Sequence, residues 1–257
     1  MTKIITLTFT LLFMGLQSHA QLNAITYKDG TQVLNGFGVR AVKESKDRSG
    51  ILILPAWKGI DEHSKETAQK LAGMGYAVFI ADIYGEGNYP GDDATAAGQK
   101  AGYYKQNIKE YQKRINLALK ELIKLGTNPN NVVVIGYCFG GTGALEAARA
   151  GMAVKGVVSF HGGLAKDPKR PNEPIAAKVL VLHGADDTYV SPAEVSAFQQ
   201  EMNESKADWQ MVYYSGAVHA FTDPYAGDDN SKGAAFNAKA AARSWQHMLD
   251  FLKEVLK

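Results

Sequence analysis

Cysteine is almost absent from this 257-residue chain, in which Cys138 is the only one. A single thiol cannot form an intramolecular disulfide, so Cys138 is expected to be either protected by burial or functional. Blocks of like charge are also missing. The 28 basic and 26 acidic residues leave a formal net charge of +2 without any basic tract. The sequence therefore gives no support for a nucleic-acid or membrane-surface partner.

Several other signatures are missing as well. No His-Glu-x-x-His or Cys/His spacing indicates a metal ion, and no glycine-rich phosphate loop indicates a nucleotide, so no cofactor is expected. The carboxylates are scattered rather than paired for glycosidase chemistry. No repeat, low-complexity tract or linker divides the chain. We expect a single domain over residues 21–257.

One long apolar run is present, at residues 4–16, between Lys3 and the small residues of Ser18-His19-Ala20. This pattern predicts a secretory signal peptide over residues 1–20, with cleavage close to Gln21. The alternative, an N-terminal membrane anchor, is disfavoured because the run is short and no stop-transfer flank follows it. We expect an exported protein, periplasmic or secreted, without stable membrane insertion after cleavage.

Short apolar segments alternate with helical patterns along the rest of the chain. An antiparallel strand pair is expected at residues 24–27 and 32–41. The further expected strands are 51–55, 76–83, 132–135, 156–160, 179–182 and 210–213, and the expected helices are 62–75, 95–125, 142–152, 192–203 and 235–256. This alternation predicts an α/β class protein with a mostly parallel central sheet and helices on both faces. Functional residues of such sheets lie beyond the carboxyl ends of the strands.

The segment Gly136-Tyr137-Cys138-Phe139-Gly140-Gly141 joins an expected strand to an expected helix. Strand, G-x-C-x-G and helix form the nucleophile elbow of the α/β-hydrolase fold, here with Cys in place of Ser. The turn holds its central residue at positive φ, so the positions of Gly136 and Gly140 must lack a Cβ. The adjacent helix N-terminus favours a Cys138 thiolate. The alternative is an inert, buried cysteine.

Two later loops carry an acid and a histidine. Asp186 and Asp187 follow the strand at 179–182, and His219 follows the last expected strand. An acid after a buried strand can orient a histidine and stabilise its imidazolium form. The order nucleophile, acid, histidine is that of α/β-hydrolases. The alternatives are turn or cap roles for the aspartates and a solvated surface position for His219.

These motifs make the chain resemble the dienelactone hydrolase family over nearly its whole mature length. The matching segments are Gly136-Tyr137-Cys138-Phe139-Gly140-Gly141, Gly184-x-x-Asp187-x-x-Val190, Gly216-x-x-His219-x-Phe221, Tyr27-Lys28-Asp29-Gly30 and Pro55-Ala56-Trp57-Lys58-Gly59. The resemblance implies a triad of Cys138 as nucleophile, His219 as base and Asp187 as orienting acid. It also implies an oxyanion hole made of the backbone N–H groups of Trp57 and Phe139.

The chain departs from the family in its charges. Where the family carries a glutamate that helps generate the thiolate, this chain has Ala56. Family arginines hold a substrate carboxylate, whereas here Lys100 matches one of them only loosely and Asp223 falls near the other. Because a buried carboxylate needs a cation, we expect neutral acyl esters or lactones to be preferred, unless Lys58 or Lys100 restores the charge.

A wider substrate pocket is expected around the triad. Tyr84 opens a glycine-containing loop at residues 84–93, and His161 follows the strand at 156–160, although a structural histidine is the alternative there. The full set of expected pocket residues is Ala56, Lys58, Tyr84, Lys100, Tyr104, His161, Phe221 and Asp223.

The sequence thus predicts a hydrolase that cleaves a small-molecule ester, thioester or lactone through a thioacyl-enzyme on Cys138. Two alternatives remain open at this point. One is a non-catalytic protein that binds a small molecule on the same fold, and the other is a peptidase resembling the prolyl oligopeptidases. The sequence does not specify the substrate or the oligomeric state.

Overall fold

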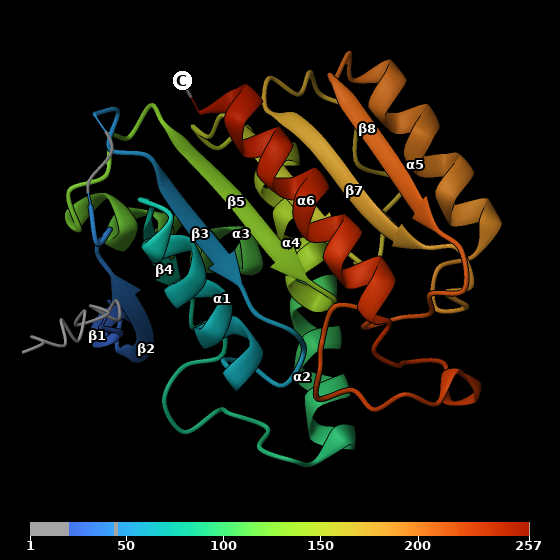
Figure 1. Cartoon of the computed structure of the whole chain (residues 1–257), viewed down its shortest axis with the longest axis horizontal. Helices are drawn as coiled ribbons and strands as arrows, with labels where there is room; N and C mark the ends of the chain where they lie inside the picture. Colours follow the sequence, from blue (N-terminus) through green and yellow to red (C-terminus); the bar gives the residue numbers. More distant parts are fainter. Residues whose placement is uncertain (1–20, 44–45, 257) are drawn as a thin grey trace, which may run out of the picture.

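The computed structural model describes residues 21–43 and 46–256, so the expected signal peptide at 1–20 lies outside the described residues. A single eight-stranded sheet runs through the molecule (Figure 1). Its strands are β1 (Asn23–Asp29), β2 (Gln32–Val39), β3 (Gly50–Leu54), β4 (Ala77–Ile80), β5 (Val132–Tyr137), β6 (Gly156–Phe160), β7 (Lys178–Gly184) and β8 (Trp209–Tyr214). The spatial order is β1-β2-β4-β3-β5-β6-β7-β8. Strand β2 pairs antiparallel with β1 and β4, and all other neighbours are parallel.

Helices cover both faces of this sheet. They are α1 (Glu62–Gly73), α2 (Ala94–Gln106), α3 (Ile108–Lys124), α4 (Phe139–Arg149), α5 (Pro192–Glu204) and α6 (Ala238–Val255), with a short 3₁₀ helix η1 (Asn230–Lys232). Helices α1 and α6 lie in front of the sheet in Figure 1, whereas α3 and α4 lie behind it. The expected mostly parallel sheet with helices on both faces, an α/β-hydrolase-type fold, is confirmed.

Alternation along β3 shows how the sheet separates two cores. Ile51 and Ile53 pack with side chains of α1 and α6, whereas Leu52 and Leu54 pack with side chains of α3 and α4. All four side chains are fully buried, because successive residues of a strand point to opposite faces and both faces are covered. Within residues 21–43 and 46–256, no helix has both the length and the apolar character required to cross a bilayer.

Several expected helix boundaries differ from the structure: the helix expected at 235–256 spans 238–255, and the one expected at 62–75 ends at Gly73. The single helix expected at 95–125 is two helices, because Asn107 leaves the helical conformation at φ −103° and ψ 58°. Its side-chain amide donates to the Tyr103 carbonyl at 2.9 Å, the kind of local bond by which Asn competes with a continuous helix. The helix expected from residue 142 begins at Phe139, since the elbow itself starts the first turn.

In-register parallel pairing brings the strand ends to one edge of the sheet. Leu54 of β3 lies opposite Gly136 of β5, and Phe160 of β6 lies opposite both Tyr137 and Leu182. The loops that follow β3, β5, β6, β7 and β8 therefore meet at this edge, where the candidate site is found.

Candidate active site

Cys138 occupies the elbow between β5 and α4 in a conformation that few non-glycine residues adopt. Its φ is 54° and its ψ is −113°, and its N–H donates to the Phe160 carbonyl at 3.0 Å. A Cβ at Gly136 would collide with the carbonyl of Gly140, and a Cβ at Gly140 would collide with the carbonyl of Leu54. The two glycines are therefore required for helix α4 to start so close to β3 and β5.

His219 connects Cys138 to Asp187. Its Nε2 lies 3.0 Å from Cys138 Sγ, and its Nδ1 donates to Asp187 Oδ2 at 2.9 Å. The Asp187 side chain is fully buried, His219 is 13% exposed, and Cys138 is half-buried. The other Asp187 oxygen accepts the backbone N–H of Tyr189 at 2.9 Å, which fixes the carboxylate. The contacts form a continuous array from a buried acid to a half-buried cysteine.

Charges within this array favour a thiolate and an imidazolium. Burial alone would lower the pKa of His219, but its hydrogen bonds to Asp187 and Cys138 outweigh burial and raise the pKa to about 10. Burial alone would raise the pKa of the Cys138 thiol. The hydrogen bond from His219, the positive charge of His219, the Phe139 N–H and the Lys105 ammonium outweigh it and lower the pKa. Cys138 and His219 share one proton, so the two groups titrate together as a pair.

The loop after β3 lies beside the elbow and carries Trp57. A bond from Gly59 N–H to the Ala56 carbonyl, 3.0 Å long, closes the turn around Trp57. The Tyr84 hydroxyl donates to the Trp57 carbonyl at 2.5 Å, and the Tyr84 ring stacks on Phe139 with centroids 6.0 Å apart. Tyr84 thus joins the two residues whose backbone N–H groups are expected to form the oxyanion hole.

Three of the expected pocket residues share a cavity beside the site. Tyr84, Lys100 and Tyr104 line a space of about 450 Å³ between α2, α3 and the loop after β4. Lys100 Nζ lies 3.4 Å from Asn88 Oδ1 in this cavity. Cys138 is not among the residues that line it. Lys100 therefore faces a space separate from the sulfur.

Besides His219, one further cation lowers the pKa of Cys138 by a smaller amount, and the sequence interpretation missed it. Lys58 is exposed, 3.8 Å from the Asp92 carboxylate. Lys105, on α2, lowers the pKa of Cys138, and its Nζ lies close to Gly163 at the rim of the site. Within the described part of the chain, the Lys105 ammonium forms no hydrogen bond or ion pair. Neither its sequence neighbours nor the family resemblance favours it over Lys100, the other lysine of α2.

The remaining expected pocket residues surround His219 or lie at its periphery. His161 and Phe221 are buried, with ring centroids 5.3 Å apart for His161–His219 and 5.2 Å apart for His161–Phe221. Asp223 is half-buried and accepts the Tyr225 N–H at 2.9 Å, while Ala56 is half-buried in the turn after β3. The structure thus places His161 and Phe221 in the packing around the imidazole, not on an open surface.

Tyr189 is a second residue that sequence reasoning missed. Its ring meets the His219 ring edge to face at 5.1 Å, yet 62% of the residue is exposed. The signal that could have found it is its position two residues after Asp187, whose carboxylate accepts its N–H. Among residues 21–43 and 46–256, no group of three or more His, Cys, Asp or Glu side chains is arranged to hold a metal ion.

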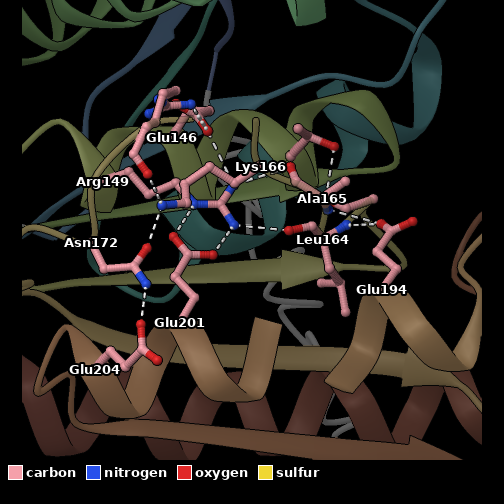
Figure 2. A network of polar contacts seen from close by, with 12 residues as sticks. Glu146, Arg149, Leu164, Ala165, Lys166, Asn172, Glu194, Glu201 and Glu204 are labelled. Carbon is pink, nitrogen blue, oxygen red and sulfur yellow. Dashed lines mark hydrogen bonds and ion pairs between the residues drawn. The ribbon is translucent and has the colours of Figure 1, made fainter. Parts of the chain in front are cut away.

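A buried ion-pair network supports the loop after β6 (Figure 2). Arg149 of α4 donates to both carboxylate oxygens of Glu201 at 2.8 and 2.7 Å, to Glu146 at 3.0 Å, and to the Leu164 carbonyl at 2.8 Å. Glu194 of α5 accepts the Leu164 N–H at 2.6 Å. The loop that begins at His161 is therefore held by both α4 and α5.

A family model and several relatives identify the family of this chain. The model of the dienelactone hydrolase family matches residues 37–256. A solved dienelactone hydrolase-like promiscuous phosphotriesterase from metagenomic libraries is 34% identical, covers 93% of this chain and 100% of its own, and superposes with a TM-score of 0.87. An Aquifex aeolicus protein that carries the name carboxymethylenebutenolidase is 27% identical over 87% of this chain and 96% of its own. An uncharacterized Caenorhabditis elegans protein is 36% identical over 46% of this chain and 77% of its own.

Proposed function

This chain belongs to the dienelactone hydrolase family, and from that premise we propose that it hydrolyses a small-molecule ester, thioester or lactone through a thioacyl-enzyme. The observation that supports this most strongly is the unbroken set of contacts from Asp187 through His219 to Cys138. A half-buried cysteine paired with a histidine that is bound to a buried acid is the arrangement of an activated nucleophile.

In the first half of the reaction, the Cys138 thiolate attacks the acyl carbon, and the carbonyl electron pair moves to oxygen. The backbone N–H groups of Trp57 and Phe139 stabilise this oxyanion. When the intermediate collapses, the bond to the leaving oxygen or sulfur breaks, and the leaving group takes the proton from His219. Cys138 is left as a thioester.

In the second half, neutral His219 takes a proton from water while the oxygen of that water attacks the thioester. Collapse of the new intermediate releases the carboxylic acid and returns the thiolate beside imidazolium. Asp187 stabilises the positive imidazole in both halves. The direct contact between His219 and Cys138 supports a thiolate in the resting enzyme, although Ala56 offers no carboxylate to help generate it.

Ester turnover tests this function against its rivals. Wild type and Cys138→Ala are compared on aryl esters, thioesters, lactones and amides. We expect the alanine variant to lose at least about 10³-fold in kcat without a change in melting temperature. Amides should react poorly, because a thiolate leaves more readily than an amine. Wild-type turnover by Cys138→Ala would reject the mechanism.

Alkylation separates an enzyme from a binding protein on the same fold. An ion-paired Cys138 should react rapidly with iodoacetamide well below pH 8, because the His219 proton keeps the sulfur ionised. In a binding protein with an ordinary thiol, the thiol would instead titrate with a pKa of about 8.5. An ordinary titration together with no turnover would favour the binding protein.

Phosphotriester hydrolysis is a second candidate activity. It is favoured by the 34% identity to the promiscuous phosphotriesterase over 93% of this chain. The Cys138 thiolate would form a bond to phosphorus as an aryloxide leaves, and water activated by His219 would then break that bond. A neutral aryl dialkyl phosphate tests this activity. Release of aryloxide that depends on Cys138 would support it, and equal release by Cys138→Ala would reject it.

A further inference from the structure

His161 is buried behind His219 and has a strained backbone. It is 2% exposed, follows β6 directly, and has a φ of 39°. Its N–H donates to the Leu182 carbonyl of β7 at 2.9 Å, and the preceding carbonyl, that of Phe160, accepts the N–H of Cys138. A side chain with a Cβ is rarely found at such a φ unless its surroundings enforce it. Two neighbouring strands enforce it here.

The imidazole of His161 contacts the loop that carries His219 at three residues. It meets the ring of His219 edge to face at 5.3 Å and the ring of Phe221 edge to face at 5.2 Å. Its Nε2 lies 2.8 Å from the Oγ1 of Thr222, which is also buried. One side chain at the end of β6 therefore fixes a loop that lies 61 residues away in the sequence.

Hydrogen bonding selects one tautomer of His161. Its Nδ1 is buried and has no hydrogen-bond partner among the described residues. A buried N–H without an acceptor is rarer than an unpaired acceptor, so the proton belongs on Nε2, which donates to Thr222. Burial first, and then the charges of His219, His63 and His183, lower the pKa of His161 well below its ordinary range. The ring is therefore neutral, and its Nε2 connects it to Thr222.

The two backbone hydrogen bonds of His219 itself lead toward the surface. The His219 N–H donates to the Gly233 carbonyl at 3.2 Å, and the His219 carbonyl accepts the Ala235 N–H at 3.0 Å. Gly233 ends the exposed 3₁₀ helix η1. These bonds tie the loop to a surface segment, whereas the bond from His161 to Thr222 ties it to the sheet that also carries Cys138.

We infer that His161 is a positioning residue for the reaction. Its neutral ring and its bond to Thr222 hold the loop against the sheet, so that His219 Nε2 stays within hydrogen-bonding distance of Cys138 Sγ. This inference rests on the proposed function, in which His219 transfers the proton. Loss of the bond should therefore weaken proton transfer and ion pairing more than substrate binding.

The experiment removes each partner of the hydrogen bond between His161 and Thr222 with side chains of similar shape. Thr222→Val removes the acceptor, His161→Phe keeps a ring but removes the donor, and Thr222→Ser keeps the hydroxyl. The matched control is Thr142→Val, because Thr142 is also buried and its hydroxyl donates at 3.0 Å to the Gly163 carbonyl, which lies in the loop after β6 and not in the loop that carries His219. Each variant is assayed for kcat and KM on an aryl acetate, for melting temperature, and for the rate of Cys138 alkylation by iodoacetamide across pH.

We expect Thr222→Val and His161→Phe to lower kcat about tenfold to 10²-fold with KM within about twofold, because a misplaced base reduces rate more than binding. The pH at which alkylation is half-maximal should rise by about one unit, since the imidazolium no longer stabilises the thiolate as well. Thr222→Ser should restore both properties. Thr142→Val should lower the melting temperature without moving the alkylation profile.

The contrary result is a loss of thermal stability in all valine and phenylalanine variants with wild-type kcat and an unmoved alkylation profile. His161 would then be a core residue only. The alkylation profile reports the pairing of His219 with Cys138 and needs no turnover. It therefore tests the role of His161 even if the proposed hydrolase function is wrong. If His161→Phe does not fold, Thr222→Val alone decides, since it replaces only a hydroxyl by a methyl group.

Discussion

Two buried polar arrays in this protein use the same kinds of contact but end differently. The ion-pair network of Figure 2 joins Arg149 to Glu146 and Glu201 through hydrogen bonds of 2.7 to 3.0 Å. The triad array joins Asp187 to His219 at 2.9 Å and His219 to Cys138 at 3.0 Å. The network is closed at its centre, where the side chains of Arg149, Glu146 and Glu201 are 3%, 1% and 7% exposed, while Arg170 at its edge is 26% exposed. The triad array ends at Cys138, which is half-buried.

Charge balance explains why the two arrays differ in reactivity. Glu201 accepts hydrogen bonds from Arg149, and Glu146 accepts them from Arg170. The two carboxylates are thus balanced by two guanidinium groups, and each of the four has a partner. No proton in this network has a nearby acceptor of comparable pKa. In the triad array, His219 and Cys138 share one proton across a contact of 3.0 Å. A fully paired network stabilises the fold, whereas an array with an open last member can react.

The largest effect on activity in this comparison is expected when Asp187, the buried end of the triad array, is changed. Asp187→Asn should lower kcat by about 10²-fold or more, because an amide N–H facing Nδ1 leaves the proton on Nε2, where it blocks transfer from the thiol. The matched control is Asp186→Asn, since Asp186 is exposed and should stay within about threefold of wild type. Both are assayed on an aryl acetate. Equal losses in the two variants would remove Asp187 from the triad.

The closed array should respond in stability instead of rate. Arg149→Met leaves Glu201 buried without its bidentate partner and should cost about 3–5 kcal/mol in urea unfolding. Lys178→Met is the control, because Lys178 is 38% exposed in its pairs with Asp208 and Glu254, and it should cost much less. Activity per folded molecule should change little. A stable Arg149→Met variant with lost turnover would contradict the division between the two arrays.

The same network gives stability a defined pH dependence. Burial alone would raise the pKa of Glu146, but its bonds to Arg170 and Arg149 outweigh burial and lower it below its ordinary 4.5. A lowered pKa stabilises the fold above the unfolded value, and this contribution is lost as pH falls through the folded value. The stability difference between wild type and Arg149→Met should therefore shrink below pH 4.5.

Much of the fold could be predicted because its signals are local. Short β-branched segments such as residues 132–135 indicate buried strands, and the spacing of Gly136 and Gly140 indicates the elbow. The contact of His219 with Cys138 and Asp187 could be expected because each member has its own motif at a strand end. Their catalytic roles remain predictions that the variants above test.

Other features have no local signal. The bond from His161 to Thr222 spans 61 residues, and the bond from Arg149 to Glu201 spans 52, without any motif at either end. The choice between Lys100 and Lys105 is a matter of helix geometry. Five residues turn an α-helix by about 500°, which places the two ammonium groups about 140° apart around α2. The family resemblance indicates a lysine on α2 but does not determine which side of the helix that lysine faces.

The smallest predicted effect comes from the different positions of Lys100 and Lys105 around α2. Lys105 lowers the pKa of Cys138, whereas Lys100 lies in the neighbouring cavity with Asn88. A cation beside the sulfur should attract an anionic reagent more than a neutral one. Lys105→Gln should therefore lower the ratio of iodoacetate to iodoacetamide alkylation rates by about threefold to tenfold at low salt. Lys100→Gln should leave the ratio unchanged.

Substrate charge can be tested in the same way, with a neutral acyl ester and its carboxylate-bearing analogue. The expected preference for neutral acyl groups rests on Asp223 and on the missing arginines, and it stays a prediction. Lys105 opposes it, because its ammonium has no carboxylate partner in the described part of the chain. If the acidic analogue is preferred by wild type, and if salt and Lys105→Gln both abolish that preference, the expectation from the sequence is wrong and Lys105 is the reason. If neither changes kcat/KM, the charge of Lys105 is screened by water at the rim and acts on the thiolate alone.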